Sequence, residues 1–137
     1  MDKIFIDSSA YIAVYNNRDS NNREAISKAA EILKEKVRGV SSNFVTDEVL
    51  TNLLVRARYR DAVGFGKTIF ETASEIEYVT IDDTIEKEAW EVFKKYNRDK
   101  FWSFTDCTSF VVMRDMGIKI VFTFDRRDFR QMGFKVL

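Results

Sequence analysis

The sequence contains no histidine, a single cysteine and no excess of either charge. Without histidine the chain can form no Ser-His-Asp triad, no histidine general base and no histidine-containing zinc site. Its one cysteine, Cys107, allows neither an intrachain disulfide nor a cysteine metal cluster, which suits a reducing compartment. The chemistry that remains is that of carboxylates with a hard metal ion, or that of lysine.

Charge and hydropathy narrow the class of protein further. Lys+Arg and Asp+Glu both number 22, so nucleic acid would have to be held by a local patch and not by bulk charge. No apolar run approaches the roughly 20 residues that span a bilayer, and acids come too early for a signal peptide. We therefore expect a cytoplasmic protein that does not enter membranes, with residues 1–137 forming one domain.

Short apolar runs alternate along the chain with segments of helical periodicity. The apolar runs predict strands at 3–6, 39–44, 77–81, 118–124 and 134–137. Helical spacing predicts helices at 10–15, 23–37, 45–59, 61–74, 82–96, 104–116 and 127–132. Apolar strands that alternate with helices are typical of a parallel sheet covered on both faces. We therefore predict an α/β fold.

Two acids come directly after predicted strands. Asp7 follows the first strand and Asp125 follows the fourth. Ligands of open α/β sheets bind at the carboxyl ends of the strands, so both acids would face one crevice if these strands are neighbours. Asp106 lies in the first turn of the helix before the fourth strand, on the side that its apolar residues mark as inward-facing. It would therefore lie near the same edge.

A fourth acid lies on the predicted helix at 45–59. Glu48 shares a face of this helix with Asn52, whereas its neighbour Asp47 points about 100° away, so only one of the two acids can face inward well. The apolar pattern slightly favours Glu48. Taken alone, Asp7 and Asp125 could equally be turn or cap residues. An acid placed like Asp106 is more often a charge that favours the start of a helix, and one placed like Glu48 is more often a solvated helix residue, so only the set of four indicates a site.

Clustered carboxylates repel one another and are costly to desolvate unless a cation neutralises them. Mg²⁺ or Mn²⁺ would do so, because these hard ions take oxygen ligands and keep several waters. Such an ion can activate a water for attack on phosphorus, and a second ion about 4 Å away can stabilise the leaving oxygen. The predicted catalytic and metal-binding residues are therefore Asp7, Asp106 and Asp125, together with Glu48, whose choice over Asp47 depends mostly on the family resemblance described next.

Four blocks of the sequence carry a resemblance to a known family. They are Ile4-Phe5-Ile6-Asp7-Ser8-Ser9-Ala10-Tyr11-Ile12, Thr46-Asp47-Glu48-Val49-Leu50, Ser103-Phe104-Thr105-Asp106-Cys107 and Phe122-Thr123-Phe124-Asp125-Arg126-Arg127-Asp128-Phe129, followed by Gly133-Phe134. In this order they resemble the motifs of the PIN-domain family, especially its VapC-type toxin ribonucleases. The resemblance extends from Lys3 to Leu137.

The resemblance implies a three-layer αβα sandwich with a central, mostly parallel sheet of about five strands. It implies an endoribonuclease that hydrolyses single-stranded or structured RNA with Mg²⁺ or Mn²⁺, and that forms homodimers. For VapC-type members it further implies the toxin of a toxin–antitoxin pair, inhibited by a small antitoxin protein.

Three other functions are weighed against this one. A non-toxin PIN ribonuclease of RNA processing shares the same four blocks. A non-catalytic module that binds RNA or protein is less favoured, because all four acids are present. A phosphatase on a doubly wound sheet is disfavoured, because the segment after the first strand lacks an Asp-x-Asp pair and there is no Gly-rich phosphate loop.

Side chains near the acids are predicted to support them or the substrate. The supporting set consists of Ser8, Asn52, Thr105, Thr123 and Asp128. Capping or turn hydrogen bonds explain Thr105 equally well. Phosphate contacts are predicted, with a solvated surface as the default, for Arg56, Arg98 and Arg126. Aromatic residues near the acids could stack on bases, but for Phe101 and Trp102 we expect core or dimer contacts.

Overall fold

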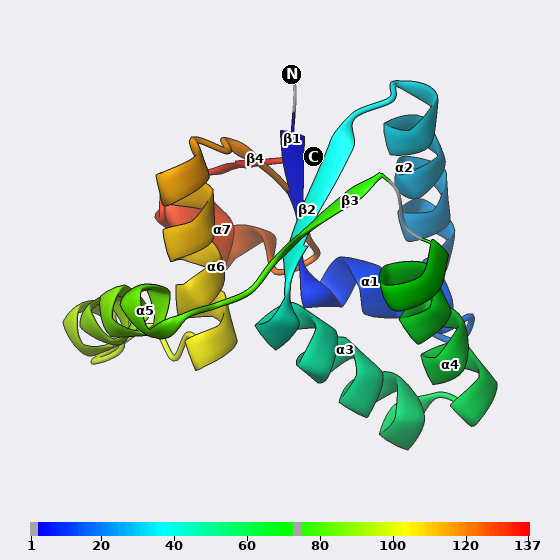
Figure 1. Ribbon diagram of the computed structural model, residues 1–137, viewed down its shortest axis with the longest axis horizontal. Helices are drawn as coiled ribbons and strands as arrows, with labels where there is room; N and C mark the ends of the chain where they lie inside the picture. Colours follow the sequence, from blue (N-terminus) through cyan, green and yellow to red (C-terminus); the bar gives the residue numbers. More distant parts are fainter. Residues whose placement is uncertain (1–2, 73–74) are drawn as a thin grey trace.

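The computed structural model describes residues 3–72 and 75–137, which form five strands and seven α-helices (Figure 1). The strands are β1 (Lys3–Ile6), β2 (Arg38–Ser42), β3 (Ile76–Val79), β4 (Ile120–Phe122) and β5 (Lys135–Val136). The helices are α1 (Ser8–Tyr15), α2 (Asn22–Lys34), α3 (Asn43–Arg56), α4 (Tyr59–Lys67), α5 (Asp83–Tyr96), α6 (Phe104–Met116) and α7 (Arg126–Gln131), with a π-helical segment η1 (Thr68–Thr72) after α4.

The five strands form one sheet in the order β3-β2-β1-β4-β5, and every neighbouring pair is parallel. From β1 the chain moves outward to β2 and β3, and then returns to place β4 on the other side of β1. The strand order therefore reverses between β1 and β4, which is where open α/β sheets bind ligands. The predicted parallel five-stranded sheet is confirmed.

Helices cover both faces of the sheet. Right-handed crossovers place the helices before β3 on one face and those after β3 on the other, because the chain changes direction across the sheet at that point. Figure 1 shows α2 and α4 on one side of the strands and α5, α6 and α7 on the other, with α3 starting where β2 ends. The predicted three-layer αβα architecture is confirmed.

Helix α6 is the buried centre of its layer. Seven consecutive residues from Cys107 to Met113 are buried, so the helix is surrounded by protein on nearly all sides. The Phe110 ring contacts Trp102 and Phe129 edge-on, with centroids 5.0 Å apart in both pairs. Gly117, with φ of 67°, ends the helix at the predicted residue. The residues at the start of α6 are therefore held on a rigid support.

The predicted helix at 61–74 is wrong in its second half. Helix α4 ends at Lys67 and η1 continues to Thr72, while residues 73–74 lie outside the described residues. The Thr72 hydroxyl donates to the carbonyl of Lys67 five residues earlier, and the Thr68 hydroxyl donates to that of Gly64. Threonine hydroxyls that bind helix carbonyls loosen the regular ladder, which accounts for the wider turn.

Within residues 3–72 and 75–137, no helix combines the length and the apolar character that a membrane crossing requires.

Candidate active site

Asp7 ends β1 at the point where the strand order reverses. Its backbone N–H donates to the carbonyl of Phe122 over 3.0 Å, so β1 and β4 stay paired up to the acid. The Asp7 side chain is fully buried. Hydroxyls of Thr123 and Ser9 donate to its Oδ2 over 2.8 and 3.1 Å, while Oδ1 has no hydrogen-bond partner among the described residues. One carboxylate oxygen is therefore held by two hydroxyls, and the other is buried without a hydrogen bond among the described residues.

The hydroxyls that hold Asp7 also join the ends of β1 and β4. Thr123 Oγ1 accepts from the backbone N–H of Asp125, and Ser9 Oγ accepts from that of Phe124, both over 2.9 Å. These side-chain partners replace the sheet ladder, which is why the predicted strand at 118–124 ends at Phe122 instead. The predicted supporting residue Thr123 is placed at the centre of this network. Sequence reasoning missed Ser9, although its position two residues after Asp7 suits such a turn bond.

Asp106 is half-buried at the start of α6. Its N–H donates to the Ser103 hydroxyl over 3.0 Å, and its Oδ2 accepts from the Ser103 N–H over 3.3 Å, which makes a reciprocal capping box. A negative charge is favoured at this end of a helix. The Thr105 hydroxyl makes no hydrogen bond to the four acids in the described part of the chain; the Thr105 carbonyl accepts from Thr108.

The structure separates Glu48 from its neighbour on α3. Glu48 is half-buried, whereas Asp47 is exposed. The Ser8 hydroxyl, from the first residue of α1, makes a short hydrogen bond to Glu48 Oε1. Asn52 follows one turn later on α3 and is half-buried. The geometry thus selects Glu48 as the acid that contacts the start of α1, beside Asp7.

The four acids lie close enough that their charges raise the pKa values of three of them, Asp7, Asp106 and Asp125. Burial raises the pKa of Asp7 to about 6, against the lowering effect of the Thr123 hydrogen bond, and the charge of Asp125 raises it further. Burial raises the pKa of Asp106 to about 7, and the charges of Asp7, Asp125 and Glu48 add to the rise. The pKa of Asp125 is raised by burial and by Asp128 and Glu48, although its side chain is partly open to solvent. The strand-end acids, the α3 acid and the α6 acid therefore form one site.

This site fits a divalent cation by its chemistry. No lysine or arginine is among the groups that shift these three pKa values, so no basic side chain offsets the mutual repulsion of the acids. The buried Oδ1 of Asp7 also has no partner among the described residues. No three acid or thiol side chains of residues 3–72 and 75–137 already stand in a metal-binding arrangement. Bridging waters or small carboxylate rotations would complete the coordination, as is usual for Mg²⁺.

The predicted phosphate-binding arginines differ in their surroundings. Arg126 is half-buried, contacts the Glu24 carboxylate of α2 and lies 5.0 Å from the ring centroid of Phe124. Its guanidinium is therefore engaged with protein groups. Arg56 and Arg98 are exposed and stay predictions.

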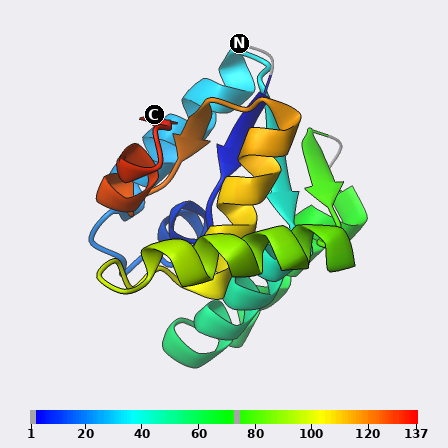
Figure 2. The same ribbon diagram turned by 90° about the vertical axis from the view of Figure 1, so that its left-hand side faces the viewer.

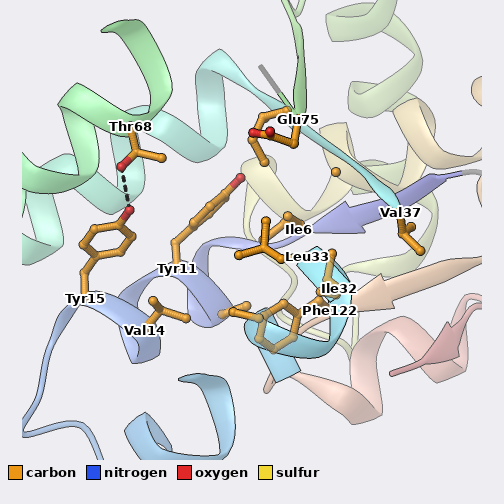
Figure 3. A pocket seen from close by; sticks show the side chains of 14 residues that line it. Ile6, Tyr11, Val14, Tyr15, Ile32, Leu33, Val37, Thr68, Glu75 and Phe122 are labelled. Carbon is orange, nitrogen blue, oxygen red and sulfur yellow. Dashed lines mark hydrogen bonds between the residues drawn. The ribbon is translucent and has the colours of Figure 1, made fainter. Parts of the chain in front are cut away.

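An apolar cavity of about 240 Å³ lies on the α2 side of the sheet (Figure 3). Tyr11, Val14, Leu33 and Phe122 contribute to its lining, and none of the four acids does. Figure 3 shows the Tyr15 hydroxyl beside Thr68, to which it donates over 2.8 Å. The cavity is separate from the carboxylate site.

Comparison with known proteins decides the family. The family model of the PIN domain matches residues 4–135. The chain belongs to the PIN-domain family. The resemblance inferred from the four sequence blocks is confirmed, and the acids of those blocks are the ones that meet at the carboxyl edge of this PIN domain.

Relatives of this PIN domain include VapC ribonucleases. The 23S rRNA-specific endonuclease VapC20 of Mycobacterium tuberculosis is 36% identical over 131 residues, which are 96% of this chain and 95% of the relative. A VapC ribonuclease of Archaeoglobus fulgidus is 27% identical over 123 residues, which are 89% of this chain and 76% of that protein. The crystal structure of M. tuberculosis VapC20, a sarcin–ricin loop cleaving toxin, superposes with a TM-score of 0.82 at 30% identity, covering 96% and 95% of the two chains.

Proposed function

We propose that this PIN domain is a metal-dependent endoribonuclease of the VapC type that cleaves structured ribosomal RNA. The observation that carries the proposal is the convergence of four carboxylates from four separate segments at the switch point of the sheet, where no lysine or arginine is among the groups that shift the pKa values of Asp7, Asp106 and Asp125. The match to VapC ribonucleases over nearly the whole chain supports the activity. The name of the 36% identical relative supports ribosomal RNA as the substrate class.

Each residue of the site has a task in this proposal. Mg²⁺ or Mn²⁺ would be held by Asp7, Glu48, Asp106 and Asp125. When bound, the ion neutralises the acids and activates water for attack on a phosphodiester. Thr123 and Ser9 bind one oxygen of Asp7 and leave the other free. Ser8 orients Glu48, and the capping box orients Asp106.

The biological part of the proposal is a toxin that a small antitoxin protein neutralises. The structural relative at 30% identity is itself a toxin. We expect the purified chain to form a homodimer, as its family resemblance implies. Expression of the chain alone should arrest growth, and the Asp7→Asn variant should relieve the arrest. Equal growth arrest by the wild type and the Asp7→Asn variant, expressed at the same level, would contradict the proposal that toxicity depends on cleavage.

The activity is tested with a stem-loop RNA that carries the sarcin–ricin loop and with a single-stranded RNA of mixed sequence. Cleavage should require Mg²⁺ or Mn²⁺ and stop with EDTA. Asp7→Asn and Asp106→Asn should each abolish cleavage while circular dichroism shows a retained fold. Asp115→Asn, on the exposed side of α6, is the matched control and should remain active. Full activity of both site variants would refute the carboxylate mechanism.

A further inference from the structure

Phe101 is explained neither by the core nor by the carboxylate chemistry. Its side chain is 86% exposed, the largest fraction among the large hydrophobic residues that the structure describes. Its φ is 61°, in the left-handed region, where Lys36 is the only other non-glycine residue of the described chain. A bulky residue in this conformation is an outlier that persists only when its surroundings impose it. Of the two contacts expected for Phe101, the core contact is therefore wrong, and the dimer contact stays a prediction.

The neighbours of Phe101 impose this conformation. The Asn97 side chain binds both backbone groups of Trp102: its Nδ2 donates to the carbonyl over 2.8 Å, and its Oδ1 accepts from the N–H over 2.6 Å. The Trp102 ring is buried against Tyr96 and Phe110, with centroids 5.5 and 5.0 Å away. Because Trp102 is fixed inward, Phe101 is held outward on a rigid loop.

The same loop leads directly into the carboxylate site. Asp106 Oδ2 lies 3.3 Å from the backbone nitrogen of Ser103, two residues after Phe101, so the Phe101 backbone lies within about 10 Å of that carboxylate. Figure 2 shows the loop between α5 and α6 at the end of the sheet where α1 and α3 begin. A base one or two nucleotides from a phosphate at the acids would thus be within reach of the ring.

We propose that Phe101 is a stacking platform for an unpaired base beside the scissile phosphate. The proposal rests on the ribonuclease function proposed above. An exposed ring supplies a face on which any base can stack, and the backbone that carries it is already held by the contacts of Trp102, so little backbone entropy is lost on binding. The exposed Arg98 and the half-buried Lys100 lie on the same loop and can face the RNA backbone. Phe101 would therefore favour RNA in which a base near the cleavage site is unstacked.

The test uses the full chain and the sarcin–ricin stem-loop RNA with Mn²⁺. Phe101→Leu should raise KM by about 10-fold with little change in kcat, whereas Phe101→Trp should keep KM near that of the wild type. Phe101→Gly should raise KM as strongly while raising Tm, because glycine relieves the positive φ. A merely structural residue would lower Tm when removed.

The matched control is Phe70→Leu. Phe70 is 62% exposed and lies on η1, with its ring centroid 5.9 Å from that of Tyr78 on β3, the edge strand that β2 separates from β1. Its substitution should leave KM unchanged. RNA binding by fluorescence anisotropy, measured in the Asp7→Asn background, should show the same ranking of the Phe101 variants.

The outcomes separate this proposal from the proposed function. If the wild type cleaves and the leucine and glycine variants keep the wild-type KM, the stacking role is refuted and the ribonuclease stands. If the wild type cleaves no RNA, the anisotropy ranking alone decides: weaker binding by the leucine variant, with binding retained by the tryptophan variant, supports the platform. Equal binding by all variants overturns it, as does a change of oligomeric state without a change in RNA binding.

Discussion

Replacing Asp7 by asparagine is expected to stabilise the metal-free protein although it removes the activity. Asp7 is fully buried, and burial raises the pKa of its carboxyl from 3.8 to about 6. Such a rise corresponds to a penalty of about 3 kcal/mol once the group is ionised at neutral pH. An asparagine oxygen can still accept from Thr123 and Ser9. The asparagine NH₂ group takes the place of the unpartnered Oδ1 and costs about 1 kcal/mol if it stays unpaired. The free energy of unfolding of the variant should therefore exceed that of the wild type by about 2 kcal/mol.

The pH dependence follows from the direction of the Asp7 shift. The folded chain holds this proton more tightly than the unfolded chain, whose pKa is near 3.8. The wild type therefore has its full stability below about pH 4 and loses this contribution as the pH rises through about 6. The Asp7→Asn variant lacks this loss. Its advantage should be absent at pH 4 and complete at pH 7.5.

Thermal unfolding in EDTA, followed by circular dichroism, measures the difference. At pH 7.5 the Tm of Asp7→Asn should exceed that of the wild type by about 4–8 °C. Mn²⁺ should then raise the Tm of the wild type and leave that of the variant almost unchanged. Asp115→Asn should show neither effect. An equal or lower Tm for Asp7→Asn at pH 7.5 would refute the inference that the buried, ionised Asp7 carboxylate destabilises the metal-free protein.

Three further predictions test separate parts of the structure. Glu48→Gln should lower the kcat of RNA cleavage by at least about 100-fold, whereas Asp47→Asn should not, and equal losses would remove the distinction between the two acids. Ser103→Ala removes the hydroxyl that caps α6, so urea denaturation should show a loss of about 1 kcal/mol; an unchanged free energy of unfolding would mean that the cap is not used. Gly39→Ala places a Cβ 2.7 Å from the Cδ1 atom of Ile6. The free energy of unfolding should therefore fall by about 1 kcal/mol while RNA cleavage is retained. An unchanged midpoint of urea denaturation would contradict this expectation.

The strand-end acids were predictable because an apolar run that stops at an acid is a local signal. Asp7 and Asp125 needed only that signal and the rule that parallel strands present ligands at one edge. Helical phase favoured Glu48 over Asp47 only slightly, and the family resemblance did most to choose it; the exposure of the two side chains agrees with that choice. Helix 104–116 was predicted to its last residue, because Gly117 is a strong stop signal.

The features that escaped prediction depend on contacts between distant segments. Ser9 supports the site only because β4 lies beside β1, which brings Phe124 and Thr123 to its hydroxyl. Arg126 is engaged by Glu24, 102 residues earlier in the chain. Phe101 is turned outward by the contacts of its neighbour Trp102. Strand order and packing determine all three of these side-chain positions, and neither can be predicted from the local sequence pattern.

Calorimetric titration of the purified chain with Mn²⁺ tests the central claim most directly. If the four carboxylates form one cation site, the wild type should bind Mn²⁺ at or below millimolar concentration, and Asp7→Asn and Asp106→Asn should each lose most of this affinity. Asp115→Asn should bind as the wild type does. No binding by the wild type at millimolar Mn²⁺, or equal binding by the site variants and the wild type, would contradict the account.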